Sequence, residues 1–493
     1  MEAESAAPTD HSDRQAVAEE ALQVVEQEVS GRSFVAQRSI QARALVLRER
    51  PLLQRPPLSH PSELTEACLR AFCRSSDSVQ QKVLSHFFAP VEEVEAATAP
   101  PNYAQMRQLL DLAEGFAPEP WASAHTLGVL RKALLCFHLN SHLFEKGAGA
   151  LFERGCLFNH ACDANAAYFA YRGELCHVAL RPIDAGDAVT VNYLGSDAII
   201  GTPMRQALMH VQKLFLCSCS RCRAPDLCRA MPCLHCHVRP IAPAATSAPA
   251  ATSAPAAPSA PTATSAPAAT STSYMVPRPI ASAVADAPAA SGGSAAPAAR
   301  PWPVEWRCET CQQEWSDQQV QALSAATPGS GDWEGGEFML SNAVFRYARE
   351  WMAHPVDAFD AHRLQQVRDH HTAVRRALGD RHWATARMAM LLAHVLGSAL
   401  AGPDATAALA TLGLSAPEAA EEFAAQSDLC WRFCAEASLP AALLADVFCA
   451  GAVEAPILRG ALGEEAFAEL WRRARAAALR RQGEACAGSR WHF

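Results

Sequence analysis

The chain lacks three features: an excess of basic residues, a long apolar run and an apolar N-terminal segment. Its 493 residues include 42 Lys and Arg against 51 Asp and Glu, a formal net charge of −9. This charge argues against a nucleic-acid-binding surface, which needs a basic face, and favours basic partners such as lysine-rich tails. No uninterrupted apolar run is long enough to span a bilayer, and residues 1–28 hold no apolar core of a signal sequence.

Charged residues are also few. They make up 19% of the chain and hydrophobic residues 50%, which indicates a globular protein with an added biased segment rather than a disordered chain. The length allows two or three domains with their own cores. The 18 cysteines include tight C-x-C and C-x-x-C clusters, unlike the dispersed cysteines of secreted disulfide frameworks. We therefore expect a reducing compartment, the cytoplasm or the nucleus.

Three short motifs between residues 155 and 222 indicate one site. They are NHACDAN at residues 159–165, GDAVTVNY at 186–193 and CSCSRC at 217–222. The last motif packs Cys217, Cys219 and Cys222 into six residues, which suits a tetrahedral metal site but leaves a Zn²⁺ ion one ligand short. Cys162 in the first motif is the natural fourth ligand. Because four thiolates leave no open position, this zinc is expected to be structural.

The order and spacing of these motifs resemble the SET domain of protein lysine methyltransferases, closest to the SET and MYND domain subfamily. The resemblance implies an α+β fold, in which a β-rich SET domain with a post-SET zinc site precedes an all-α, tetratricopeptide-like C-terminal domain. It also implies an enzyme that transfers a methyl group from S-adenosylmethionine to a lysine of a histone or non-histone protein. In this resemblance Tyr193 is the catalytic tyrosine, which orients the amine and borders the cofactor.

The resemblance assigns further cofactor contacts to residues that precede the first motif. Gly31, Arg32 and Ser33 correspond to a turn against the methionine end of S-adenosylmethionine, with Ser33 in place of the family's second glycine. Taken alone, these residues would favour a plain surface turn. Asn140 is expected against the amino-acid portion of the cofactor. A buried, hydrogen-bonded Asn140 without a cofactor role is the alternative.

The remaining cofactor contacts implied by the resemblance lie around the metal motif. Asn159 and His160 are expected to contact adenine and methionine, largely through backbone and amide groups. Phe215, two residues before Cys217, corresponds to the aromatic residue that stacks on adenine. An ordinary core phenylalanine is the alternative for this position.

One departure from the subfamily concerns its MYND zinc finger, which usually lies where this chain has residues 51–120. That segment offers only Cys68 and Cys73, far fewer ligands than such a module needs. We therefore predict that the finger is absent, together with any partner recognition that depends on it.

A second departure concerns the lysine channel. Lys213 stands where the family has a second channel tyrosine, four residues before the first cysteine of the post-SET cluster. A cation there would repel the substrate ammonium, unless another aromatic residue such as Phe144 or Tyr168 supplies the wall. Together with Ser33, Lys213 motivates an alternative function: a catalytically inactive SET-like, zinc-binding scaffold for protein–protein interaction.

Two further C-x-x-C pairs follow the three motifs, Cys233 with Cys236 and Cys308 with Cys311. Paired motifs of this kind form a zinc ribbon when a short loop separates them. Here residues 237–300 intervene, rich in Ala, Pro, Ser and Thr, and we predict that they are disordered. Because the entropy of loop closure grows only logarithmically with length, one shared zinc is favoured over two unrelated pairs.

The pattern along the chain predicts five segments. They are an N-terminal tail with a short helix (1–28), the SET domain with a helical insertion at 51–120 and post-SET cysteines (29–236), the disordered insert (237–300), the second half of the ribbon (301–335) and a helical C-terminal domain (336–493). Periodicity and turn signals predict helices at residues 16–29, 79–88, 103–116, 124–144, 197–216, 362–378, 383–400, 417–437, 439–450 and 464–482, and strands at 31–36, 40–47, 166–171, 175–180 and 188–193. We expect a monomer whose partner is a lysine-bearing substrate protein, with no membrane and no nucleic acid involved.

Overall fold

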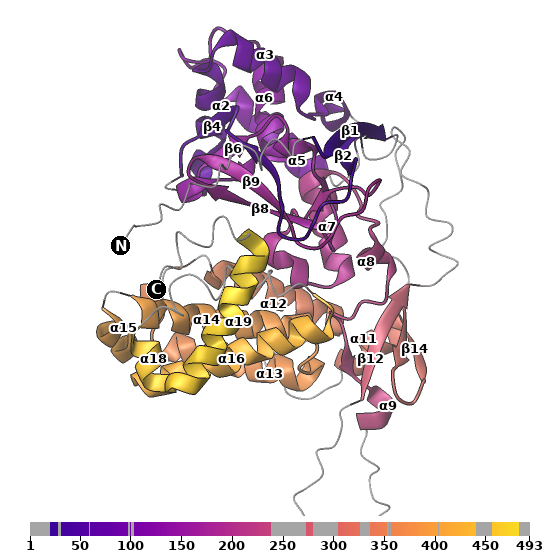
Figure 1. Cartoon of the computed structure of the whole chain (residues 1–493), viewed down its shortest axis with the longest axis vertical. Coiled ribbons are helices and arrows are strands. Elements are labelled where there is room, and N and C mark those ends of the chain that lie inside the picture. Colours follow the sequence, from indigo (N-terminus) through magenta and orange to yellow (C-terminus); the bar gives the residue numbers. More distant parts are fainter. Residues whose placement is uncertain are drawn as a thin grey trace, which may run out of the picture.

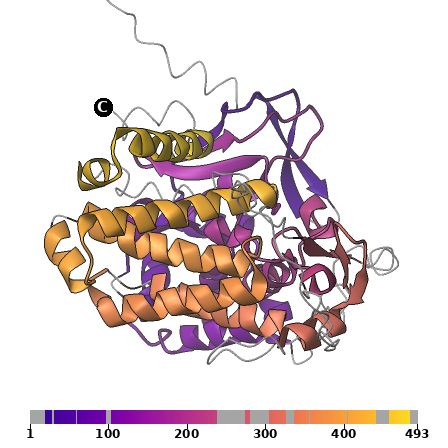
Figure 2. The same ribbon diagram turned by 90° about the horizontal axis from the view of Figure 1, so that it is seen from below.

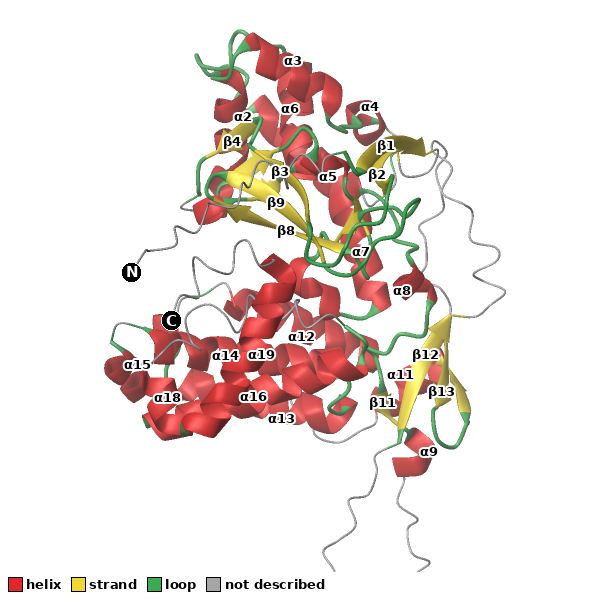
Figure 3. Ribbon diagram, in the orientation of Figure 1, coloured by secondary structure: helices red, strands yellow, loops and turns green. Residues whose placement is uncertain are grey.

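The computed structural model shows an N-terminal part of strands and helices above a helical C-terminal part, with a small sheet beside the latter (Figure 1). It describes residues 20–27, 31–58, 60–96, 99, 103–237, 273–279, 304–325, 336–352, 354, 356–402, 404–439 and 456–482. Strands are confined to the N-terminal part and the small sheet in the part of the chain that the structure describes (Figure 3). This distribution confirms the predicted α+β class with a helical C-terminal region.

Short antiparallel sheets form the centre of the N-terminal part. One sheet has the order β3-β9-β8 and another the order β4-β6-β5. Arg172 and Gly173 join β8 to β9 with positive φ angles of 51° and 80°, the backbone that a tight hairpin turn between twisted strands requires. The strands are β3 (Leu45–Glu49), β9 (Glu174–Ala179), β8 (Ala166–Tyr171), β4 (Leu53–Arg55), β6 (Gly149–Leu151) and β5 (His142–Leu143).

The helical insertion packs on one side of these sheets. The helix that follows the insertion, α6 (Leu127–Asn140), begins where the Thr126 side chain accepts a hydrogen bond from the backbone N–H of Val129, at 3.4 Å. Buried apolar residues such as Leu134 and Phe137 recur along α6 and join it to the insertion. The helices of the insertion are η1 (Pro61–Glu63), α2 (Leu64–Cys73), α3 (Asp77–His86), α4 (Val91–Glu95) and α5 (Ala104–Glu114).

The start of the described chain corrects the prediction of a helix over residues 16–29. The chain forms β1 (Leu22–Gln27), which pairs antiparallel with β2 (Gly31–Ala36). The β-branched pair Val24 and Val25 suits a strand, and the hydrogen bonds offered by β2 outweigh the helix propensity of the neighbouring Leu, Gln and Glu. Residues 40–47 also differ from the expected strand pair, because their strand, β3, pairs with β9 instead of β2.

The small sheet has the order β11-β12-β13-β14 and corrects the prediction of disorder throughout residues 237–300. Its strand β12 (Tyr274–Pro279) lies inside that segment and buries Met275, Val276 and Pro277. The local sequence Tyr-Met-Val is apolar and β-prone, unlike the Ala-Pro repeats around it. The other strands are β11 (Met231–Pro232), β13 (Val304–Cys308) and β14 (Glu314–Ser316), and α9 (Leu234–His237) and α11 (Asp317–Ala325) flank them.

The C-terminal part stacks antiparallel helices around α14 (Trp383–Ala401) (Figure 2). Stop and start signals set the boundaries: Asp360 caps α13 (Ala361–Leu378), and Ser415 with Glu418 forms a capping box at α16 (Ala416–Glu436). The predicted helices at 362–378, 383–400, 417–437 and 464–482 are confirmed within a residue or two, whereas 440–450 lies outside the described residues. The remaining helices are α12 (Glu337–Met352), η6 (Val356–Ala358), α15 (Ala405–Thr411), α18 (Pro456–Leu462) and α19 (Glu464–Gln482).

Helix α14 is long and apolar enough to cross a membrane by length and composition alone. Of the apolar stretch of α14, 83% is buried inside the protein, against α12, α13 and α16. The helix also carries the buried Arg387, whose guanidinium lies 2.8 Å from the carboxylate of Asp197 in the N-terminal part. These contacts make α14 the core helix of the C-terminal part.

A buried ionic cluster joins three segments of the chain. Arg229, just before β11, donates to the Glu337 carboxylate at the start of α12 with N–O distances of 2.6 and 3.1 Å, and His382 at the start of α14 lies 3.0 Å from the same carboxylate. Burial raises the pKa of Glu337, but the charge of Arg229 and the hydrogen bond from His382 outweigh it and hold that pKa well below its usual range. The carboxylate is therefore charged at neutral pH and fully paired.

We expect Arg229→Met to lower the free energy of unfolding by about 3–5 kcal/mol, because it leaves Glu337 buried without its main partner. Urea denaturation followed by circular dichroism measures this change. The matched control is Arg459→Met, which breaks an exposed ion pair with Glu464 and is expected to leave stability essentially unchanged. Equal effects of the two variants would contradict the assigned role of the cluster.

Candidate active site and metal centres

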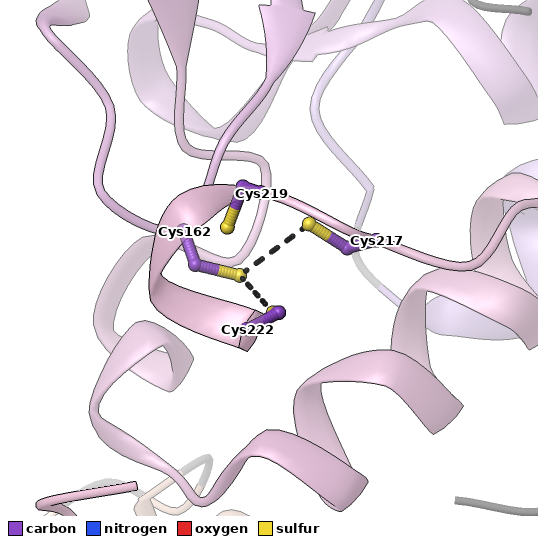
Figure 4. Close-up of side chains that lie close together, drawn as sticks. All are labelled: Cys162, Cys217, Cys219 and Cys222. Atoms are coloured by element: carbon purple, nitrogen blue, oxygen red, sulfur yellow. Dashed lines mark hydrogen bonds between the residues drawn. The ribbon is translucent and has the colours of Figure 1, made fainter. Parts of the chain in front are cut away.

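Four thiols of the first metal centre converge from two distant segments (Figure 4). The Cys162 sulfur lies 3.8 Å from that of Cys217 and 3.6 Å from that of Cys222, and all four sulfurs, with Cys219, lie within 4.8 Å of one another. Ligands held tetrahedrally at a Zn–S distance of about 2.3 Å lie about 3.8 Å apart, so the sulfur positions fit a zinc ion. The structure thus brings together all four ligands predicted from the motifs.

The surroundings of this centre also suit thiolates. The neighbouring thiols of Cys217, Cys219 and Cys222 lower the pKa of Cys162 far below its ordinary value. The buried guanidinium of Arg205, on α7 (Thr202–Lys213), lies 3.9 Å from the Cys222 sulfur. A nearby cation and a hydrogen-bond donor stabilise a cluster of negative sulfurs. Four sulfur donors leave no open position, so the centre is structural.

The second metal centre lies at the end of the small sheet. Sulfur–sulfur distances are 3.8 Å for Cys233 with Cys311 and 3.9 Å for Cys236 with Cys308. The backbone N–H groups of Thr310 and Cys311 point to the Cys308 sulfur at 3.3 and 3.4 Å, the turn geometry of a zinc knuckle. The two C-x-x-C pairs therefore share one tetrahedral set of sulfurs, as predicted, and β12 completes the sheet between them.

The segment after residue 155 runs from a turn, η4 (Gly155–Leu157), into β7 (Asn159–His160), which pairs in parallel with β10 (Thr190–Val191). The Asn165 side chain ties the two segments further. Its amide donates to the Ala188 carbonyl and its oxygen accepts from the backbone N–H of Thr190, both at 2.8 Å. This pairing places the first two motifs side by side. The strand predicted over 188–193 is shorter than expected, because the chain turns at Asn192.

His160 connects the metal centre to Tyr193. One ring nitrogen, Nδ1, accepts from the backbone N–H of Tyr193 at 3.1 Å, and the other, Nε2, lies 3.3 Å from the Cys162 sulfur. Because Nδ1 accepts, the ring proton is assigned to Nε2 and points to that sulfur. The rings of His160 and Tyr193 lie 5.3 Å apart, and Phe215 lies 6.1 Å from His160 on the other side.

The Tyr193 phenol is half-buried and donates a hydrogen bond to the Phe158 carbonyl at 2.7 Å. Burial, with smaller contributions from Cys156 and Tyr168, raises the pKa of Tyr193 well above its usual value. The phenol therefore stays protonated at any physiological pH, and its oxygen keeps lone pairs to accept a further hydrogen bond.

Of the other residues predicted to contact the cofactor, two side chains form hydrogen bonds with the protein itself. Both amide hydrogens of Asn140 are already used, by the carbonyls of Phe88 and Cys136 at 2.9 Å, which is the hydrogen-bonded alternative left open by the sequence. Gly31, Arg32 and Ser33 lie on β2, and Arg32 hydrogen-bonds His86 instead of facing His160.

Ser33 differs from its neighbours, because it is almost fully buried. Its hydroxyl has no hydrogen-bond partner among the described residues. The next residue, Phe34, packs on Phe158 with ring centroids 4.9 Å apart. The β2 segment is therefore adjacent to the N-H motif through Phe34, whereas Arg32 hydrogen-bonds His86.

An aromatic cluster beside Tyr193 was not identified from the sequence. His177 stacks on Phe158 with ring centroids 4.0 Å apart, and Tyr168 lies 4.9 Å from His142 and 5.9 Å from His177. Three ring nitrogens of the two histidines have no partner among the described residues. Tyr168 thus supplies an aromatic wall near Tyr193, and it also packs against the cluster of Phe144 and Phe152, whose ring centroids lie 5.5 Å apart. A single histidine in a β-strand carries no sequence signal for such a cluster.

Lys213 lies against this site. Its ammonium nitrogen donates to the Leu139 carbonyl at 2.6 Å and lies 5.7 Å from the ring centroid of Tyr193, within the range of a cation–π contact. The cation predicted at the channel is therefore present there.

Comparison with known proteins identifies the domain. Residues 31–194 match the model of the SET domain family. The SET domain that the motifs predict is therefore confirmed over these residues. Matched curated relatives are histone-lysine N-methyltransferase SMYD3 of Mus musculus, 33% identical over 87 residues, and SMYD3 of Homo sapiens, 27% identical over 150 residues.

These alignments are partial. They cover 18% of this chain and 20% of the mouse protein, and 30% of this chain and 30% of the human protein, so the chain spans less than a third of the length of the curated relatives it matches. Among solved structures, the SET domain of LSMT bound to lysine and AdoHcy aligns with a TM-score of 0.31 at 13% identity, over 44% of this chain and 60% of that chain.

We expect two zinc ions per purified chain, measured by elemental mass spectrometry. Cys219→Ser and Cys308→Ser should each reduce the content to about one, because each removes one of four ligands from a different centre. Cys219→Ser should also lower the melting temperature, since the metal ties residue 162 to residues 217–222. The control Cys73→Ser, outside both centres, should keep two ions. A single ion in the native chain would contradict the assignment of two centres.

Proposed function

We propose that the chain is a protein-lysine N-methyltransferase that uses S-adenosylmethionine. The SET domain at residues 31–194 and the names of the matched relatives support this function. The observation that carries it is the contact of His160 with both the Cys162 sulfur and the backbone of Tyr193. That contact fixes the proposed cofactor-binding segment and the proposed catalytic tyrosine in one arrangement.

Methyl transfer from a sulfonium to an amine is a direct displacement. The protein must hold the acceptor nitrogen, the methyl carbon and the sulfur in line and exclude water, and little acid–base chemistry is required. S-adenosylmethionine, when bound, supplies the methyl group on a positively charged sulfur. Asn159, His160 and Phe215 would hold it, with Gly31 and the buried Ser33 on the adjacent strand; Arg32 and Asn140 have other partners.

Tyr193 is the residue that we assign to the acceptor amine. Because its hydroxyl donates to the Phe158 carbonyl, the phenol oxygen can accept from an amine N–H and orient the nitrogen lone pair toward the methyl group. The acceptor lysine must be neutral to attack. Its desolvation among Phe158, Tyr168 and Tyr193, next to the positive sulfur of the cofactor, would lower its pKa.

The alternative is an inactive SET-like scaffold for protein–protein interaction, and one specific observation favours it. Lys213 places an ammonium group over the ring of Tyr193, where a substrate ammonium would experience repulsion. The two functions differ in their need for the methyl donor. A scaffold has no requirement to bind S-adenosylmethionine, whereas the enzyme must bind it.

The substrate and the cellular location are also proposals. The net charge of −9 favours a basic protein such as a histone as the substrate. The many reduced cysteines and the two thiolate centres suit the cytoplasm or the nucleus. Fractionation of cells that express the tagged chain, followed by immunoblotting, would test the location.

The test of function has two steps. Calorimetry with the zinc-loaded full chain should show binding of S-adenosylmethionine, and labelled cofactor should then transfer radioactivity to a protein in a panel of histones and cell extracts. Tyr193→Phe should keep cofactor binding and reduce kcat by about 10²-fold, because the acceptor amine loses its orienting oxygen. Tyr171→Phe, at a half-buried tyrosine at the end of β8, is the control and should keep full activity. Absence of cofactor binding would remove the enzyme function.

A further inference from the structure

Lys213 is the last residue of α7, and its side chain turns into the proposed active site. The next residue, Leu214, has a left-handed backbone with φ of 63°, which ends the helix. From this position the Lys213 nitrogen reaches the Leu139 carbonyl at 2.6 Å and lies over the ring of Tyr193. A sequence-distant helix thus delivers one ammonium group to the tyrosine assigned to the acceptor amine.

The contacts of Lys213 are those that an acceptor lysine would need. They comprise a backbone carbonyl that accepts from the nitrogen and an aromatic face that accommodates it. An incoming lysine carries the same group, so both cannot occupy this end of the channel while both are charged. At a separation of a few ångströms in a partly buried site, repulsion between two ammonium groups amounts to at least a tenfold effect.

Lys213 forms no ion pair with a carboxylate among the described residues. The titratable groups that face it are His138 at the end of α6, His142 on β5 and Tyr193 after β10, and His210 lies one turn earlier on its own helix. Burial first, and then the charge of Lys213, lower the pKa of both His138 and His142 to about 4, so these two are neutral in a methylation assay.

Burial also lowers the pKa of Lys213, to about 8. The amine is therefore mostly charged at pH 7 and mostly neutral at pH 9. An arginine could not be discharged in this way. Lysine is rare in this chain, with only Lys82, Lys132, Lys146 and Lys213 among its 42 basic residues, whereas the buried basic residues of the other ion pairs are arginines.

We propose that Lys213 is an internal competitor of the acceptor lysine: it occupies the amine-binding end of the channel in its charged form and admits a substrate lysine in its neutral form. This inference rests on the proposed methyltransferase function and adds its specificity-determining residue. The chain would accordingly methylate slowly at neutral pH and faster in mildly alkaline solution, beyond the increase that deprotonation of the substrate itself produces.

The test compares kcat/KM of the native chain, Lys213→Gln and Lys213→Arg with the best substrate of the panel, at pH 7 and pH 9. The Gln side chain keeps a donor for the Leu139 carbonyl without a charge, and Arg keeps the charge at both pH values. We expect Lys213→Gln to exceed the native chain about tenfold at pH 7 and to approach it at pH 9. Substrate deprotonation affects every form equally and cancels in this ratio.

The matched variant Lys213→Arg should fall below the native chain at both pH values, and the gap should widen from pH 7 to pH 9. The ratio of kcat/KM between Lys213→Arg and the native chain keeps the test decisive even if Lys213→Gln does not fold. Thermal melts will show whether each variant folds. A Gln-to-native ratio that stays the same at the two pH values, or an Arg variant as active as the native chain at pH 9, would overturn the inference.

Cofactor binding separates this inference from the function on which it rests. Calorimetry should show binding of S-adenosylmethionine in all three forms, because Lys213 contacts Tyr193 and Leu139 and none of the residues assigned to adenine. If the native chain binds the cofactor and transfers methyl groups but Lys213→Gln brings no gain, only the inference fails. If no form binds the cofactor, both fail. Mass spectrometry after the reaction should find Lys213 unmodified, since a methylated Lys213 would make it a substrate instead of a competitor.

Discussion

The active-site half of this molecule depends on the closure of four thiolates from two segments that lie more than fifty residues apart. Cys162 follows the N-H motif directly, and Cys217, Cys219 and Cys222 follow α7. Whatever binds the four sulfurs therefore fixes α7 against β7, and with it Phe215 and Lys213 against Tyr193. His160 extends this constraint to the backbone of Tyr193. The role of the metal centre is structural, because it sets the positions of the side chains around it.

Local sequence patterns predicted the site better than they predicted the strand pairing. The two sets of four thiols that lie together in the structure were predicted from their spacing, because close cysteine spacing suits tetrahedral metal binding. The C-terminal helices were identified because their apolar periodicity and the turn signals between them are local features of the sequence. By contrast, residues 22–27 form a strand only because β2 is available to pair with them. No local sequence signal identifies the strand with which a segment will pair. Strand β12 was missed for a related reason, since six ordered residues lie within a long segment of low complexity.

Around Tyr193, too, the sequence alone did not predict which side chains come together. Tyr193 itself was identifiable from its motif, and Lys213 from its distance to the cysteines. His142 and His177 come from separate strands of two different sheets. His177 lies opposite Tyr168 in the β8–β9 hairpin, whereas His142 approaches Tyr168 only when β5 and β8 are brought together. The prediction for Asn140 left two roles open, and its amide is occupied by two carbonyls. Residue type and spacing thus determine ligands, whereas the shape of a channel requires the folded arrangement.

The parallel pairing of β7 with β10 has a consequence for the order of folding. The two strands are connected through the β8–β9 hairpin and the turn at residues 180–187, so they can meet only after that intervening unit is compact. Contacts of such long sequence separation form late, since the entropy of closing the loop must be offset by contacts already made. Cys162 emerges from the ribosome well before Cys217, Cys219 and Cys222. The nascent chain therefore presents Cys162 without its three partner thiols for some time, and the site is completed from its C-terminal side.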